Sequence, residues 1–205
     1  MNRRAMSGPP RFLLPALLCL AACSPGGGES ASPPLEGARI GGDFSLVDKA
    51  GKPVRFHDFA GQYRVVYFGY TFCPDVCPLD VQKLMKGYAQ FAQAEPDVAA
   101  RVQPIFVTID PARDGPKEVG EFAAAFSPRL IGLTGTEQQV AEAAKMFAVY
   151  RKKGEVTANG GYMMDHSSQA YLFDPEGKPL ALLPVDLPPA QAPQAIAADL
   201  AKWTS

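Results

Sequence analysis

The order of apolar and polar positions along the chain predicts alternating strands and helices. A continuous apolar run at 65–68 and a mostly apolar segment at 102–109 are typical of strands that are buried on both faces of a sheet. Apolar residues at helical spacing follow each of them, at 81–92 and 119–126. This alternation predicts an α/β fold in which helices cover both faces of a central sheet.

The flanking regions extend the predicted sheet. Residues 44–56 alternate around a turn at 48–51, which predicts an N-terminal β-hairpin. Beyond the second helix the same pattern predicts strand 130–133, helix 140–147, a polar Gly-rich loop at 151–161, strands 170–173 and 180–183, and a terminal helix ending at 203. This order of elements is that of a thioredoxin-like fold, with a mixed sheet and the N-terminal hairpin as an extension.

The first 22 residues are typical of a targeting segment. Three arginines come before an eleven-residue apolar run at 12–22, which is shorter than the ~20 residues of a membrane-spanning helix. The run ends in Leu-Ala-Ala-Cys at Cys23, which resembles the lipobox of bacterial lipoproteins. We therefore expect a lipoprotein signal peptide at 1–22 and a lipid anchor on Cys23. The alternative is an ordinary cleaved signal with an incidental cysteine.

One linker and one domain follow the signal. Residues 23–38 are dense in Gly, Ser and Pro and lack periodic apolar positions, which is typical of a flexible tether. Residues 39–205 then form a single domain, since 205 residues are too few for two comfortable ones. Together these segments predict a bacterial cell-envelope protein, held by lipid with its domain on the periplasmic or other extracytoplasmic side.

Charge and composition narrow the possible partners. The chain has 20 basic and 21 acidic residues, a formal net charge of −1 and a pI near 6.1. Without a positive field it is not expected to bind nucleic acid. Only four cysteines and two histidines are present, so each can be considered individually as a soft ligand or a nucleophile.

Two of the cysteines, Cys73 and Cys77, stand between a buried strand and the next helix. Backbone N–H groups at a helix start stabilise a thiolate, so we expect lowered thiol pKa values there. A structural disulfide, a catalytic dithiol and a metal site all fit this spacing. A structural bridge gains little because it closes a very short loop. Two thiolates and one imidazole suit Cu(I) or Cu(II), whereas structural zinc prefers four protein ligands.

The imidazole has to come from His57 or His166. His57 follows a hairpin strand, where an isolated histidine is usually a surface or turn residue. His166 lies at the entry to a later strand, which the thioredoxin order places beside the cysteine loop. His166 is therefore the better candidate. The thioethers of Met163 and Met164 stand next to it, although methionine at a strand entry is more often a core residue.

Three segments together resemble the SCO/SenC family of copper proteins. They read FGYTFCPDVCP at 68–78, VTIDPARD at 107–114, and DHS at 165–167 followed by YLFDPEG at 171–177. The similarity covers roughly residues 42–203. It implies a membrane-tethered thioredoxin fold that binds one copper ion.

The resemblance also implies roles for particular residues. The copper ligands it implies are Cys73, Cys77 and His166, and the two cysteines form a disulfide when oxidised. Asp110 matches an aspartate that lies near the copper site in the family. A capping or turn role at the strand end explains Asp110 equally well.

The family is associated with assembly of the dinuclear copper centre in subunit II of cytochrome c oxidase. The resemblance therefore implies a metallochaperone that delivers copper to this centre, not a conventional enzyme. The alternatives are a thiol-disulfide oxidoreductase that reduces the cysteines of the centre, and a redox or copper sensor. Thioredoxin-like oxidoreductases carry a cis-proline before the penultimate strand, and this chain has no proline between Pro128 and Pro175, which favours metal binding.

The predicted chemistry also requires further partners. Both the chaperone and the oxidoreductase need reduced cysteines in an oxidising compartment. We therefore expect an upstream thiol reductase or copper donor in addition to the acceptor.

Overall fold

The computed structural model describes residues 32–204 and contains a five-stranded sheet in the order β5-β4-β3-β8-β9. The strands are β3 (Tyr63–Gly69), β4 (Val102–Thr108), β5 (Ile131–Leu133), β8 (Ala170–Phe173) and β9 (Pro179–Leu183). The first three run parallel, and β8 and β9 are each antiparallel to their neighbours. The mixed sheet of the predicted thioredoxin-like fold is confirmed.

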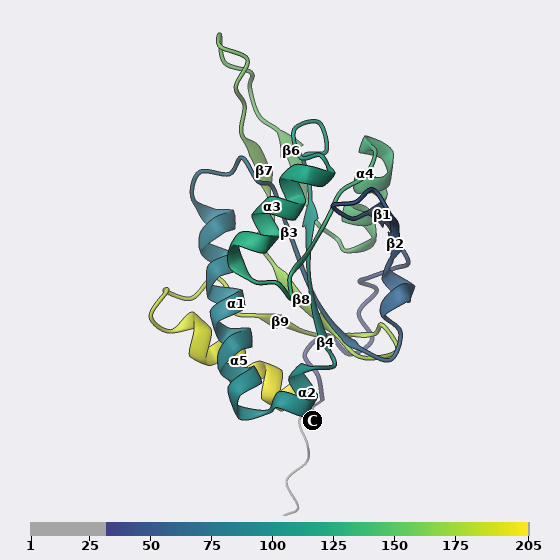
Figure 1. The fold of residues 1–205 in the computed structure, drawn as a ribbon, viewed down its shortest axis with the longest axis vertical. Helices are drawn as coiled ribbons and strands as arrows, with labels where there is room; N and C mark the ends of the chain where they lie inside the picture. The colour runs from purple at the N-terminus through teal and green to yellow at the C-terminus, as the bar shows by residue number, and fades with distance from the viewer. Residues whose placement is uncertain (1–31, 205) are drawn as a thin grey trace, which may run out of the picture. The chain divides into compact units, whose positions relative to one another are not determined.

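Helices cover both faces of this sheet, as Figure 1 shows. They are α1 (Val76–Ala94), the short α2 (Pro96–Ala99), α3 (Pro116–Phe126), α4 (Glu137–Met146) and α5 (Ala192–Trp203). α1, α3 and α5 lie on one face. α4 lies on the other, together with the predicted N-terminal hairpin of β1 (Ser45–Val47) and β2 (Pro53–Arg55) and the 3₁₀ turn η1 (Phe56–Phe59).

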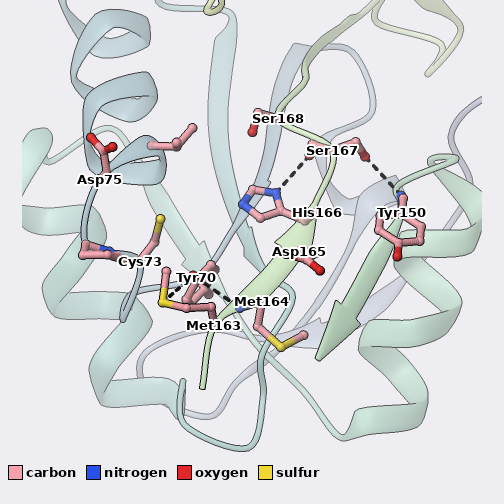
Figure 2. Close-up of a pocket in the computed structure, with 12 residues that line it drawn as sticks. Tyr70, Cys73, Asp75, Tyr150, Met163, Met164, Asp165, His166, Ser167 and Ser168 are labelled. Atoms are coloured by element: carbon pink, nitrogen blue, oxygen red, sulfur yellow. Dashed lines mark hydrogen bonds between the residues drawn. The ribbon is translucent and has the colours of Figure 1, made fainter. Parts of the chain in front are cut away.

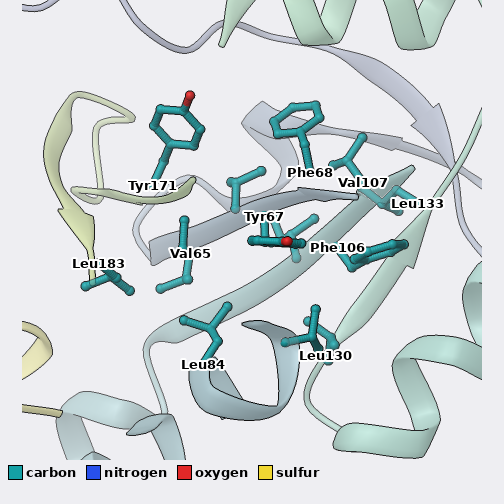
Figure 3. Packing of buried hydrophobic residues seen from close by; sticks show 14 of the residues in the cluster. Val65, Tyr67, Phe68, Leu84, Phe106, Val107, Leu130, Leu133, Tyr171 and Leu183 are labelled. Carbon is teal, nitrogen blue, oxygen red and sulfur yellow. The ribbon is translucent and has the colours of Figure 1, made fainter. Parts of the chain in front are cut away.

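The alternation of side chains along β3 divides the core between these two faces. Tyr67 stands in register with Phe106, and Figure 3 shows both on the side of the sheet that faces Leu84 of α1. Phe68 points to the opposite side, where its ring centroid lies 5.2 Å from that of Phe147 at the end of α4. The side chains on both faces of β3 are apolar because elements packed on each side of the sheet bury this strand.

A second hairpin carries His166 and differs from the sequence prediction. Residues 151–161 were expected as a loop, but they begin with strand β6 (Arg151–Lys153), which pairs with β7 (Met164–His166). The prediction missed β6 because Arg-Lys-Lys has no apolar alternation, and the strand forms by pairing with β7. The connection between the two strands projects beyond the end of the sheet (Figure 1).

The end of the predicted tether lies within the described residues. Residues 33–36 form a turn, and the Leu35 N–H donates to the Leu180 carbonyl at 3.0 Å. The predicted signal peptide and Cys23 lie outside the described residues. None of the helices within 32–204 combines the length and apolar character that a membrane-spanning helix needs.

Candidate metal centre

The fold brings Cys73, Cys77 and His166 to one end of the sheet. β3 ends at Gly69, a turn carries Cys73, and Cys77 follows in the first turn of α1. His166 is the last residue of β7. His57 is exposed and lines a different pocket, with Asp43, so it is not part of this group.

Two of the three side chains are in direct contact. Cys77 Sγ lies 3.3 Å from His166 Nε2. Cys73 is joined to the pair through the backbone, because the Cys77 N–H donates to Cys73 Sγ at 3.4 Å. Within residues 32–204, no three His, Cys, Asp or Glu side chains already form a closed metal-binding group. The site therefore presents one contacting pair of donors and one adjacent thiol.

The approach of the Cys77 sulfur depends on Gly69. A Cβ at this position would lie 3.1 Å from Cys77 Sγ and 2.9 Å from Tyr67 Cε1. Any side chain at Gly69 would therefore push against the sulfur or the ring. Sequence reasoning missed this residue, although its place at the end of a buried strand, just before the cysteine motif, was a usable signal.

The two thiols have opposite electrostatic environments. Partial burial raises the pKa of Cys73, but hydrogen bonds outweigh it and leave that pKa lowered; they come from the backbone of Cys77 and Asp75 and the side chains of Cys77 and Tyr70. Cys77 is fully buried, and burial is the main reason that its pKa is raised. The expectation that both pKa values are lowered was wrong for Cys77, because loss of solvent outweighs its place at the helix start.

The surroundings of His166 favour a neutral imidazole whose Nε2 can bind a metal ion. Burial lowers its pKa, which favours the uncharged ring near neutral pH. Its Nδ1 lies 3.0 Å from the Ser167 carbonyl; because a carbonyl only accepts, Nδ1 carries the proton and Nε2 keeps its lone pair toward Cys77. Ser167 is fixed in turn, since its N–H donates to the Tyr150 carbonyl at 3.2 Å. This arrangement is typical of a metal-binding histidine.

A buried carboxylate braces the turn that carries Cys73. Asp114 accepts from the Thr71 N–H at 2.8 Å, from Thr71 Oγ1 at 2.6 Å and from Thr108 Oγ1 at 2.7 Å. Its carbonyl also accepts from Thr134 Oγ1 at 2.6 Å. Asp114 thus links the ends of β3, β4 and β5. Burial raises its pKa, while the hydrogen bonds from Thr108 and Thr71 oppose this rise.

Asp110, the other aspartate of the 107–114 motif, forms an ion pair with an arginine. Its carboxylate accepts from Arg113 Nε at 2.6 Å and from the Tyr162 hydroxyl at 2.8 Å. The Arg113 guanidinium lies 3.6 Å from the Tyr162 ring centroid and 5.0 Å from that of Phe72. In the structure Asp110 therefore orients Arg113 and the connection before β7, and no contact with the cysteines or His166 is found among its hydrogen bonds.

An open cavity of about 600 Å³ lies over the site. Figure 2 shows Cys73, Tyr70, Met163 and His166 around it. Met163 is 50% exposed at its rim, whereas Met164 is 7% exposed and belongs to the core. The site is therefore accessible to an ion or a partner from one side.

The geometry defines a class: a thioredoxin-fold protein with two thiols and an imidazole at the end of the central sheet. Comparison with known proteins gives the family. The SCO1/SenC family profile matches residues 32–205, and the chain belongs to this family.

Individual relatives agree with the family. The mouse mitochondrial SCO2 homolog is 43% identical over 144 residues, 70% of this chain and 56% of that protein, so the chain spans about half the length of such relatives. Copper-bound Bradyrhizobium japonicum ScoI has 34% identity and a TM-score of 0.70, covering 80% of this chain and 99% of that one. Copper-bound yeast Sco1 has 32% identity and a TM-score of 0.70, covering 80% and 87%.

The relatives correct the predicted location. The mouse protein and further animal and yeast relatives are described as mitochondrial, which points away from the bacterial envelope that the N-terminal pattern suggested. The pattern was ambiguous in physical terms. Residues 1–28 contain three arginines and no acidic residue, and such composition is also typical of mitochondrial transit peptides.

Proposed function

We propose that this protein is a copper metallochaperone. It binds one copper ion through Cys73, Cys77 and His166 and delivers it to the dinuclear copper centre in subunit II of cytochrome c oxidase. The observation that carries the proposal is the 3.3 Å contact between Cys77 Sγ and His166 Nε2, with the Nδ1 proton held by the Ser167 carbonyl. A soft sulfur and an imidazole lone pair directed at each other suit copper.

The state of the two thiols supports binding as well as release. Cys73 is partly exposed, and its lowered pKa makes its thiolate available as the first protein ligand. Cys77 is buried with a raised pKa, so its proton leaves when copper takes its place. Copper is the cargo, and ligand exchange with cysteine and histidine groups of an acceptor removes it, after which Cys77 takes up a proton from solvent again.

Alanine variants test the ligand set. Copper stoichiometry and sulfur-to-copper charge-transfer absorption are measured on the reduced protein and on Cys73→Ala, Cys77→Ala and His166→Ala. Each should lose tight binding, while the matched control His57→Ala should keep it. Binding that survives His166→Ala and fails in His57→Ala would overturn the assignment. Anaerobic transfer from the loaded protein to a purified subunit II domain tests delivery.

A second function is favoured by the asymmetry of the cysteines. An accessible thiolate beside a buried thiol is the arrangement of an attacking and a resolving cysteine. In such a reaction the Cys73 thiolate attacks a disulfide of the acceptor and releases its first thiol. Cys77 then attacks the Cys73 sulfur of the mixed disulfide and releases the second acceptor thiol. The chain becomes a Cys73–Cys77 disulfide, and the acceptor receives two electrons and two protons as two thiols.

The two functions separate in a copper-free assay. If the protein is a thiol reductant, the reduced protein should reduce an oxidised subunit II domain stoichiometrically in the presence of a copper chelator. The Cys77→Ala variant should stop at the mixed disulfide. The chaperone alone predicts no disulfide reduction under these conditions.

A further inference from the structure

The thioether of Met163 is a third sulfur at the candidate metal centre. Met163 stands one residue before β7, lines the cavity with Cys73 and His166, and is 50% exposed. Resting on the proposed function, we propose that Met163 is a further Cu(I) ligand, which holds the ion at the open side of the cavity while it enters or leaves.

Tyr70 joins Met163 to the cysteine. Its hydroxyl lies 3.8 Å from Met163 Sδ, and the same side chain contributes to the lowered pKa of the Cys73 thiol. Tyr70, Cys73 and Met163 line the same cavity, and Figure 2 shows the Met163 thioether turned toward Tyr70. Tyr70 itself is fixed, because it is 1% exposed and its ring meets the His166 ring edge-on at 5.9 Å.

Exposure orders the sulfurs from solvent to interior. Met163 is half-exposed, Cys73 is partly buried and Cys77 is fully buried. An ion that steps along this order always keeps at least one sulfur ligand while the next bond forms. The buried pair of Cys77 and His166 is its end point, and Met163 is its point of contact with a donor or an acceptor.

A thioether suits this position chemically. It is neutral and soft, so it binds Cu(I) in preference to harder ions and needs no deprotonation. On entry, a Met163–copper bond forms as a bond to the donor breaks. A bond to Cys73 Sγ then replaces the Met163 bond, and bonds to His166 and Cys77 follow as the Cys77 thiol gives its proton to solvent. Copper stays Cu(I) in every exchange, and Met163 neither gains nor loses a proton.

The neighbouring Met164 provides a matched control. Met163→Leu and Met164→Leu each remove one sulfur and keep an apolar side chain of similar volume, and both residues line the same cavity. His166→Ala makes the effect visible, because the ion then lacks its imidazole and Met163 completes its ligand set. In that background, Met163→Leu should weaken Cu(I) binding by about tenfold or more relative to Met164→Leu, measured by competition with a Cu(I) chelator.

Methyl NMR provides a readout that does not depend on transfer. Protein labelled at its methionine methyl groups is titrated with Cu(I), and the Met163 signal is assigned by its loss in Met163→Leu. Its chemical shift should change in the His166→Ala variant, and the Met164 signal should stay. The proposal is overturned if the Met163 signal does not move, if the two leucine variants bind alike, or if His166→Ala binds no Cu(I).

The experiment separates this inference from the proposed function. If Cys73→Ala and Cys77→Ala bind Cu(I) as tightly as the unchanged chain, the proposed copper site is wrong, and Met163 fails with it. If both cysteine variants lose Cu(I) and Met163→Leu behaves like Met164→Leu, only the role of Met163 is wrong.

Discussion

The two segments that carry the candidate ligands are held in place by different kinds of contact. The turn at 70–75, with Cys73, is braced from inside the protein by Asp114, which is fully buried and accepts three hydrogen bonds from Thr71 and Thr108. The β6–β7 hairpin, with His166, is braced by Arg113, whose side chain is mostly buried and lies against the Tyr162 ring.

This difference separates global from local stability. The Asp114 contacts link three strand ends, so they break only when the sheet opens. The Arg113 contacts join the loop before α3 to the connection between β6 and β7. This connection can open while the sheet stays folded. We infer that changes at Asp114 act on the whole domain and on the cysteine turn, whereas changes at Arg113 act mainly on the hairpin.

Removing the buried carboxylate is expected to have the largest effect. Asp114→Ala leaves Thr71 N–H, Thr71 Oγ1 and Thr108 Oγ1 without their acceptor, and Thr108 and the site of the lost carboxylate are fully buried. The free energy of unfolding should fall by about 3 kcal/mol, measured by urea unfolding. Asp114→Asn keeps one acceptor oxygen and should lose less. Equal losses in both variants would show that charge, and not hydrogen bonding, is the brace.

Crowding the Cys77 sulfur comes next. Gly69→Ala places a Cβ 3.1 Å from Cys77 Sγ and should reduce the free energy of unfolding by about 2 kcal/mol, as overpacking in a core does. Copper binding should weaken as well, because the sulfur is displaced from His166. Gly161→Ala is the matched control, since its Cβ would meet only Thr157 Oγ1, at 3.3 Å. If Gly69→Ala keeps both stability and copper affinity, the close approach has no consequence.

The parts of the structure that could be predicted from sequence are those with a local signal. Residues 65–68 are continuously apolar, and β3 is buried on both faces as this pattern predicts. The residue types Cys73, Cys77 and His166 stood out by their chemistry, and the fold brings them to one end of the sheet. Strand β6 had no such signal, because charged residues at 151–153 form a strand only through pairing with β7.

The contacts that tune the site had no signal in the sequence either. Asp114 and Thr71 are 43 residues apart, and a hydrogen bond over that separation leaves no periodic pattern. The pKa of Cys77 depends on burial, which overrides the helix start and reverses the predicted direction. Local rules thus predicted where the cysteines stand, and tertiary packing decides how each of them ionises.

Removing the Arg113 contacts should affect the hairpin more than the domain. Arg113→Ala loses the 2.6 Å bond to Asp110 and the 3.0 Å bond to the Tyr162 carbonyl. Within the described residues its Nη2 is buried without a hydrogen-bond partner, which offsets part of this stabilisation. We expect a loss of about 1 kcal/mol in unfolding free energy and faster amide hydrogen exchange at 154–163.

Two variants sharpen the test of Arg113. Arg113→Lys keeps the charge but not the flat guanidinium that stacks on Tyr162, so it should behave like Arg113→Ala. Lys117→Ala removes only an exposed ion pair with Glu121 at 3.4 Å and should leave exchange at 154–163 unchanged. If exchange accelerates across the β3 and β4 strands as well, Arg113 braces the whole domain, and the contrast with Asp114 is lost.

The smallest expected effect comes from pH alone. Burial raises the pKa of Asp114 in the folded protein above its value in the unfolded chain. Between these two values the folded state binds more protons, so the contribution of Asp114 to stability is complete below the unfolded pKa and declines as pH rises through the folded pKa. Asp114→Asn has no such group.

The difference in unfolding free energy between the unchanged chain and Asp114→Asn should therefore shift in favour of the unchanged chain as pH falls through this window. Urea unfolding at a series of pH values measures it, and because other titrating groups cancel in the difference, a constant difference would mean that burial does not perturb Asp114.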